Sequence, residues 1–140
     1  MQKRKMNSIV VRLQKGDLLK ESISKICIDN EIKAGVIISS VGSLVKARIR
    51  NAGATKIEEI NRDLEILSLN GTVSKERIHL HICVSDSDLQ TYGGHLEAGS
   101  VVNSTCELVI LKLDEYEFDK VYDEKTGYNE LLIKKIKEEK

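Results

Sequence analysis

Hydrophobic and polar residues alternate along several stretches of the chain, the pattern typical of β-strands that are buried on one face. The clearest of these stretches read NSIVVRL at 7–13, DLEILSLNGTVS at 63–74, RIHLHICVS at 77–85 and VVNSTCELVILKL at 101–113. The segments EFDKVYD, EKTG and YNELLIKKI, which follow one another near the end of the chain, predict a closing β-hairpin. About seven or eight strands are therefore expected.

Two pairs of residues that contain glycine mark the expected interruptions of these strands. Residues 34–50 consist of an apolar run, the pair Gly42-Ser43 and a second run with basic residues, which predicts two strands joined tightly. The pair Asn70-Gly71 tolerates positive φ, so a turn or a bulge is expected there.

One segment has the periodicity of a helix. Its apolar residues recur at steps of three and four positions, the spacing of a buried helical face, at Leu19, Ile23, Ile26 and Cys27. Asp17 is the expected N-cap, and Gly35 marks the exit from the segment. The fold class predicted is α+β, a mainly antiparallel β-sheet with one principal helix.

Length and composition are those of one ordinary domain. With 140 residues, 41% hydrophobic and 31% charged, the whole of 1–140 is expected to fold around a single core. No apolar run approaches the ~20 residues that cross a bilayer, and the start of the chain does not resemble a signal peptide. Three widely spaced cysteines predict core residues in a reducing compartment, so a cytoplasmic location without membrane association is expected.

The charge of the chain argues against strong nonspecific binding of nucleic acid. The 22 basic and 22 acidic residues balance, so any contact with DNA would have to be local. The candidate basic patches are the run KRK at 3–5 and a row of alternate residues on one strand face, Lys46, Arg48 and Arg50. Both patches are more often plain solvated surface.

All three histidines fall within the stretch RIHLHICVSDSDLQTYGGHL. His79 and His81 are two positions apart in a predicted strand, so both side chains point to one face and can converge on one ion. Gly93 and Gly94 would let the backbone turn and bring His95 close to that strand. Three histidines with an open fourth position are typical of a catalytic or exchangeable zinc site. Histidines on a polar strand face are, however, more often surface residues than metal ligands.

Other side chains near the histidines have alternative interpretations. Cys83 shares the predicted face and is a second candidate ligand or a nucleophile, although parallel neighbours on a strand disfavour a nucleophile and base pair. Asp86 and Asp88 are expected to cap the following turn, with support of the histidines as the alternative. The general-base candidates Glu65 and Glu107 are residue types more often exposed on strands.

Five blocks of the sequence, in order, resemble the plants-and-prokaryotes conserved (PPC) domain family. The blocks read RLQKGD, AGVIISSVGSL, LEILSLNGTVS, HLHICVSD and GGHLEAGSVVNSTCELVI. They extend over residues 12–110, which is most of the chain. The resemblance implies the prokaryotic stand-alone type, a mainly antiparallel sheet packed with a helix, and assembly into a homotrimer.

The resemblance also implies a site and a function. His79, His81 and His95 correspond to the histidine cluster of prokaryotic members, so a divalent transition metal is expected, with zinc as the ion. Plant members carry AT-hook motifs that bind DNA, and no such tract occurs in this sequence, so direct DNA binding is doubtful. Two functions stay open: a noncatalytic assembly or DNA-associated regulatory module that acts with a protein partner, or a metal-dependent enzyme or small-molecule sensor.

Overall fold

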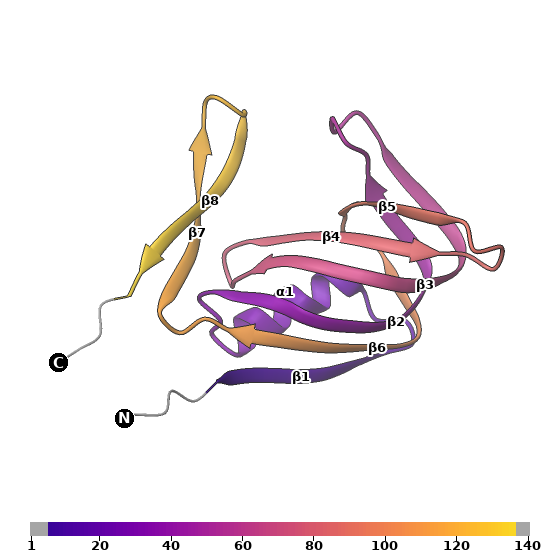
Figure 1. Cartoon of the computed structure of the whole chain (residues 1–140), viewed down its shortest axis with the longest axis horizontal. Coiled ribbons are helices and arrows are strands. Elements are labelled where there is room, and N and C mark those ends of the chain that lie inside the picture. The colour runs from indigo at the N-terminus through magenta and orange to yellow at the C-terminus, as the bar shows by residue number, and fades with distance from the viewer. Residues whose placement is uncertain (1–5, 137–140) are drawn as a thin grey trace.

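A curved antiparallel sheet, a helix behind it and a projecting hairpin make up the fold (Figure 1). The structure, a computed structural model, describes residues 6–136. Along the chain the elements are β1 (Asn7–Gln14), α1 (Leu19–Asp29), β2 (Gly35–Arg50), β3 (Ile57–Val73), β4 (Ile78–Ser85), β5 (Thr91–Leu96), β6 (Val101–Lys112), β7 (Tyr116–Asp123) and β8 (Tyr128–Lys135). The predicted α+β class, mainly antiparallel with one principal helix, is confirmed for this part of the chain.

The main sheet contains six strands in the order β1-β6-β2-β3-β4-β5, and all of its pairings are antiparallel. The end of β2 also pairs with β5, through Ile49 with Leu96 and Arg50 with His95. Because β5 pairs with β4 on one side and with β2 on the other, the strands from β2 to β5 close on themselves. This closure places the end of β2 beside β5, and β5 lies beside β4.

The core lies between α1 and the sheet. Leu19, Ile23 and Cys27 of the helix are buried, and Leu80 and Ile82 of β4 belong to the same hydrophobic cluster. The fourth residue of the predicted helical stripe, Ile26, is only partly buried at its edge. Because the even-numbered residues of β4 face the core, its odd-numbered residues face the opposite side, as the alternation predicted.

The start of α1 differs from the prediction, because Leu18 and not Asp17 occupies the N-cap position. Leu18 makes no capping bond with its side chain. The carboxylate of Asp17 instead accepts a hydrogen bond of 2.8 Å from the backbone N–H of Gln14, and the Asp17 N–H donates to the Gln14 carbonyl. The aspartate therefore closes the turn between β1 and α1.

The expected turn at Gly42-Ser43 is wrong, since β2 runs without interruption from Gly35 to Arg50. Gly42 serves a different purpose: a Cβ atom placed there would lie 2.1 Å from the carbonyl oxygen of Thr105 in β6. Glycine at this position allows two neighbouring backbones to approach closely. The pairing of β2 with β6 shifts register directly after Gly42.

The strand β3 likewise continues through Asn70-Gly71, so the turn expected there is absent. The expectation of positive φ is correct, because Gly71 has a φ of 152°. A Cβ atom on Gly71 would lie 1.9 Å from the carbonyl oxygen of His79 in β4, which leaves room only for glycine. The irregularity in the pairing of β3 with β4 falls earlier, between Ile66 and Ser68.

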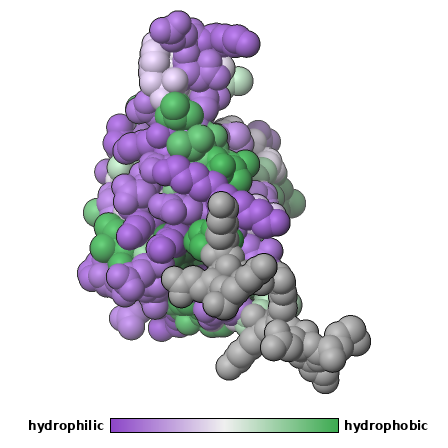
Figure 2. Space-filling view, turned by 90° about the vertical axis from the view of Figure 1, so that its left-hand side faces the viewer, coloured by the Kyte–Doolittle hydropathy of each residue, from purple (hydrophilic) through white to green (hydrophobic). Residues whose placement is uncertain are grey.

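The predicted closing hairpin is confirmed as the antiparallel pair β7 and β8. Its base is attached to the rest of the fold, because the Phe118 N–H donates to the Lys33 carbonyl and the hydroxyl of Ser74 donates to the Phe118 carbonyl. Its far end projects from the sheet in Figure 1. Figure 2 shows hydrophobic atoms gathered below the polar end of this projection.

Among the described residues, no helix has the length and apolar character that a membrane span requires.

Candidate metal centre

The three histidines meet on the face of β4 that points away from the core. His79 and His81 occupy alternate positions of β4, and His81 is paired directly with His95 of β5. Each histidine offers one ring nitrogen to the cluster, and these three nitrogens all lie within 4.8 Å of one another. The ring centroids are 5.2, 5.3 and 5.7 Å apart. The three residues that the sequence singled out are thus brought together into one cluster.

His95 reaches the cluster by a route that differs from the prediction. Gly93 and Gly94 lie within β5 and not in a sharp loop. A Cβ atom on Gly94 would lie 2.6 Å from the carbonyl oxygen of Arg50, so glycine is what allows β5 to pack against β2. As a result His95 is paired with His81 on one side and with Arg50 on the other.

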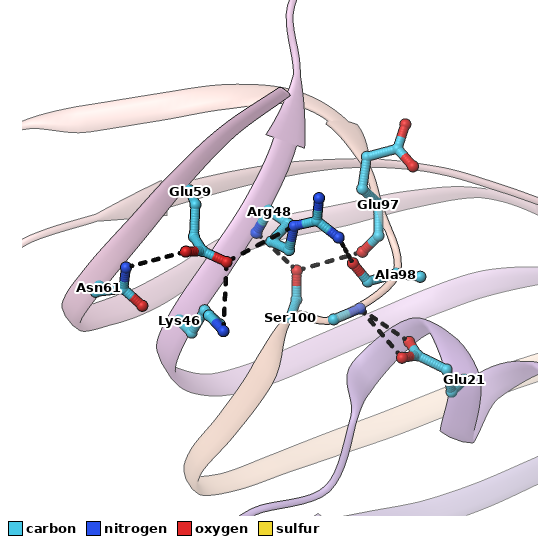
Figure 3. A network of polar contacts seen from close by, with 9 residues as sticks. Glu21, Lys46, Arg48, Glu59, Asn61, Glu97, Ala98 and Ser100 are labelled. Carbon is cyan, nitrogen blue, oxygen red and sulfur yellow. Dashed lines mark hydrogen bonds and ion pairs between the residues drawn. The ribbon is translucent and has the colours of Figure 1, made fainter. Parts of the chain in front are cut away.

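Polar contacts fix the turn that follows β5 (Figure 3). The N–H of Glu97 donates to the carbonyl of Arg48, and the Arg48 guanidinium donates to the carbonyl of Ala98 at 3.0 Å. The N–H of Gly99 donates to the carboxylate of Glu21 in α1 at 3.1 Å. The turn is therefore tied to both the sheet and the helix, and Glu97 is held two residues after the last histidine.

The nitrogens of His95 have different surroundings. Its side chain is 16% exposed, its Nε2 lies 4.0 Å from Oε1 of Glu97, and its buried Nδ1 has no hydrogen-bond partner among the described residues. An unpartnered buried polar atom costs about 1–3 kcal/mol. A metal ion at Nδ1 would supply the missing partner, and a carboxylate beside the other nitrogen is the usual support of a metal-bound histidine. The donor set therefore fits a metal.

The pKa shifts of the histidines favour their neutral forms. Burial, followed by the charges of Arg50 and Lys20, lowers the pKa of His95 to about 4. Burial, followed by the charge of Arg77, lowers the pKa of His79 below its usual value. Neutral imidazole is the form that coordinates a metal, so both rings are ready to bind near neutral pH.

Arg77 contacts the cluster directly, with its Nη2 atom 3.2 Å from Nδ1 of His79. A guanidinium group can only donate, so Nδ1 accepts this hydrogen bond and the proton of the neutral ring is on Nε2. Arg77 was not predicted as a site residue, although its position two residues before His79 continues the alternation of the polar face.

The hairpin borders the cluster on another side. The guanidinium carbon of Arg50 lies 6.0 Å from the centre of the Tyr128 ring at the start of β8. The charge of Glu130, also in β8, acts on His79. These residues were missed because nothing local in the sequence places the hairpin beside β4.

The three basic residues on one face of β2, Lys46, Arg48 and Arg50, have two different surroundings. Lys46 and Arg48 lie 3.3 and 3.8 Å from the carboxylate of Glu59 in β3 (Figure 3). A hydrogen bond from Asn61 and the contact with Lys46 lower the pKa of Glu59. Arg50, by contrast, belongs to the surroundings of the histidines. The other basic patch, at 3–5, lies outside the described residues.

The three cysteines are free, as expected. Cys27 and Cys106 are buried, and burial raises the pKa of Cys27 to about 11 and also raises that of Cys106. Raised values keep both thiols protonated and unreactive. Cys83 is half-buried on the histidine face of β4 but lies outside the cluster of three.

The remaining acidic candidates have structural positions. The carboxylate of Asp86 accepts hydrogen bonds from the backbone N–H groups of Asp88 and Gln90, so the capping prediction is confirmed for Asp86. Asp88 contributes only its N–H to this turn. Glu65 and Glu107 are exposed strand residues outside the cluster, in agreement with the more ordinary of their two interpretations.

Two solved structures resemble this chain over nearly its whole length. A hypothetical protein from Salmonella cholerae-suis is 30% identical with a TM-score of 0.90, and the match covers 96% of this chain and 97% of the other. A metal-containing protein from Archaeoglobus fulgidus is 29% identical with a TM-score of 0.76, and the match covers 94% and 99%.

Sequence comparison leads to the same family as the resemblance. The bifunctional protein GlmU of Synechococcus sp. (strain JA-3-3Ab) is 38% identical over 128 residues, 91% of this chain and 21% of that protein. The chain thus spans about a fifth of the length of the curated relatives it matches. The family model of the Plants and Prokaryotes Conserved (PCC) domain matches residues 1–114. This chain therefore belongs to the Plants and Prokaryotes Conserved (PCC) domain family.

Proposed function

We propose that this protein is a noncatalytic, homotrimeric module whose three-histidine site binds one divalent transition metal, with zinc as the ion. The observation that carries the proposal is the convergence of His79, His81 and His95, one nitrogen of each lying within 4.8 Å of the others. Three imidazoles with a fourth position for water or a ligand are a typical zinc set. The metal-containing relative from Archaeoglobus supports the proposal.

We favour binding over catalysis for two reasons. The side chains considered for catalysis, Cys83, Glu65 and Glu107, lie outside the histidine cluster. The chain also matches about a fifth of a longer relative, which supports the idea of a module that works with other protein units. The alternative, a metal-dependent enzyme or small-molecule sensor, is favoured by one observation. Arg50 Nε is buried beside the cluster without a partner among the described residues.

The proposal of a homotrimer rests on the family and on the surface of the hairpin. Large apolar side chains on both faces of the hairpin are about half exposed. Tyr122 and Ile133 lie on one face, and Val121 and Tyr128 lie on the other. Figure 2 shows hydrophobic surface on this side of the molecule. Exposed apolar side chains commonly mark contacts between proteins, and further copies of the chain would cover those on the face that contains Tyr122 and Ile133.

Any association with DNA is assigned to a protein partner. The balanced net charge offers few sites for phosphate neutralisation. Two of the three basic residues in the row on β2 are already paired with Glu59. The three free cysteines support a reducing compartment, and we place the protein in the cytoplasm.

Metal analysis of variants tests the proposal. Tag-free protein is incubated with zinc, desalted and measured by elemental analysis. We expect one zinc per chain in the wild type and in Cys83→Ser, and a loss of stoichiometric zinc in His81→Ala. Cys83 is the matched control because it lies on the same face of the same strand. Equal zinc in the wild type and His81→Ala would refute the site, and loss in Cys83→Ser alone would mean a different ligand set.

A further inference from the structure

We propose that the metal centre binds a small oxyanion, a carboxylate or a phosphate, which Arg77 and Arg50 hold while one of its oxygens occupies the open position on the metal. This inference rests on the proposed metal site and names the class of ligand that the site takes. Two arginines beside the site, Arg77 and Arg50, have hydrogen-bond donors that lack an acceptor when the metal is bound.

Metal binding removes the acceptor that Arg77 uses. Arg77 donates to Nδ1 of His79 at 3.2 Å. A neutral imidazole that binds a metal through one nitrogen carries its proton on the other, so it has no lone pair left to accept a hydrogen bond. This holds whichever nitrogen of His79 binds the metal. The Arg77 donor is then free for an acceptor beside the ion.

The Nε atom of Arg50 is buried and also lacks an acceptor among the described residues. Arg50 is paired with His95 across β2 and β5, so both side chains stand on the same side of the sheet. The guanidinium carbon of Arg50 lies 6.0 Å from the centre of the Tyr128 ring, whose face attracts the cation without accepting the hydrogen of Nε. Two guanidinium groups with unmet donors thus border one metal position.

The charges around the cluster favour an anion once a divalent ion is present. Arg50, Arg77 and Lys20 all act on the histidines, opposed by the carboxylates of Glu97 and Glu130. A divalent ion makes this region more positive still. Guanidinium groups bind carboxylate and phosphate oxygens through paired, charge-assisted hydrogen bonds. A bound anion would therefore neutralise positive charge and also accept hydrogen bonds from the two arginines.

A neighbouring cleft provides space for the rest of such a molecule. Its volume of about 430 Å³ falls within the range of small-molecule sites. Arg77 lines this cleft and also contacts His79, so the cleft and the cluster share the Arg77 side chain. Three cationic residues line the cleft, Lys20, Lys75 and Arg77. Two acidic residues, Glu21 and Glu76, line it as well. Glu21 is already engaged with the Gly99 N–H.

Cobalt-substituted protein tests the inference, because the visible spectrum of cobalt responds to a change in its ligands. The full chain is loaded with cobalt and titrated with inorganic phosphate in one arm and with acetate in the other. We expect a saturable spectral change in at least one arm, and the arm that responds more strongly identifies phosphate or carboxylate as the ligand. In Arg77→Gln and in Arg50→Gln, cobalt content should be unchanged and the anion affinity about tenfold weaker or more.

Arg62→Gln is the matched control, because Arg62 pairs with Asp86 and contacts Tyr92, away from the histidines. Its anion affinity should equal that of the wild type. A cobalt-loaded wild type that responds to neither anion would overturn the inference while leaving the metal site intact. The same conclusion would follow if all three variants responded like the wild type. A wild type that binds no cobalt would overturn the metal site and this inference together.

Discussion

His81 of β4 lies directly opposite His95 of β5, with the two ring centroids 5.7 Å apart. The pairing depends on β5 filling the space between β4 and β2. Because residues opposite each other in an antiparallel pair share a face, a second strand adds a third imidazole to the pair on β4.

Replacement of Gly94 should damage the centre. The Cβ of Gly94→Ala would lie 2.6 Å from the Arg50 carbonyl oxygen and 2.7 Å from a methyl carbon of Ile49, so β5 must shift. We expect a loss of stability of about 1–3 kcal/mol, the usual cost of overpacking, together with reduced zinc content. Urea denaturation and elemental analysis measure the two effects.

Gly93→Ala is the control for this prediction, because its Cβ would meet nothing closer than 3.2 Å, at the Ile82 carbonyl oxygen. Its stability and zinc content should stay near those of the wild type. Equal behaviour of the two variants would show that close packing of β5 against β2 does not position His95.

The stability of the metal-free protein should fall in acid because of His95. Its pKa is about 4 in the folded chain and about 6.5 when unfolded. The unfolded chain therefore binds this proton more readily, so the contribution of His95 is complete above about pH 6.5 and is lost as the pH falls toward 4. His95 contributes up to about 3 kcal/mol to the free energy of unfolding.

Urea denaturation at pH 7 and pH 4.5 measures this effect in the wild type and in His95→Gln. Carboxylates also titrate in this range, so the difference between the two proteins is the informative quantity. The variant should lose less stability on acidification. An identical loss in both would mean that His95 is not held neutral by the fold.

A trimer of 15.7 kDa chains is expected in solution at micromolar concentration. Ile133→Lys places a charge on the hairpin face that contains Tyr122 and Ile133, and it should shift the population toward smaller species. Leu89→Lys, at an exposed turn residue, should not. Light scattering gives the mass in each case, and a single-chain particle for the wild type would disprove the trimer.

Direct binding to DNA should be weak. With zero net charge, we expect the purified protein to bind A·T-rich duplex at physiological salt no more tightly than ~10⁻⁴–10⁻⁶ M, the range of nonspecific contact. Fluorescence anisotropy with A·T-rich and G·C-rich duplexes tests this. Tight binding that depends on the sequence of the duplex would contradict it.

Local sequence patterns predicted the parts of the fold that depend on local periodicity. Alternation in β4 placed His79 and His81 on one face, and the helical stripe of α1 was found from residue spacing. The glycines show where such reasoning stops. Gly42 and Gly71 suggested turns but serve the close approach of β6 and β4, respectively. A glycine in a turn and a glycine beside a distant backbone look alike in sequence.

The histidines of the candidate site could be predicted from the sequence, but the residues that surround them could not, because they come from distant strands. The three histidines were found because they are close in sequence. Arg50 joins them only because β2 pairs with β5, a contact that residue patterns do not specify. Tyr128 and Glu130 join only because the hairpin folds back beside the sheet. The charges that surround the histidines therefore required the structure.

X-ray absorption spectroscopy of the zinc-loaded, tag-free protein tests the metal centre most directly. We predict three imidazole nitrogens at about 2.0–2.1 Å and one further light-atom ligand, with the multiple-scattering pattern of histidine and no sulfur. In His95→Gln the imidazole signal should fall or the metal should be absent. A zinc–sulfur distance of about 2.3 Å, or a first shell of oxygen without imidazole, would contradict a centre built from His79, His81 and His95.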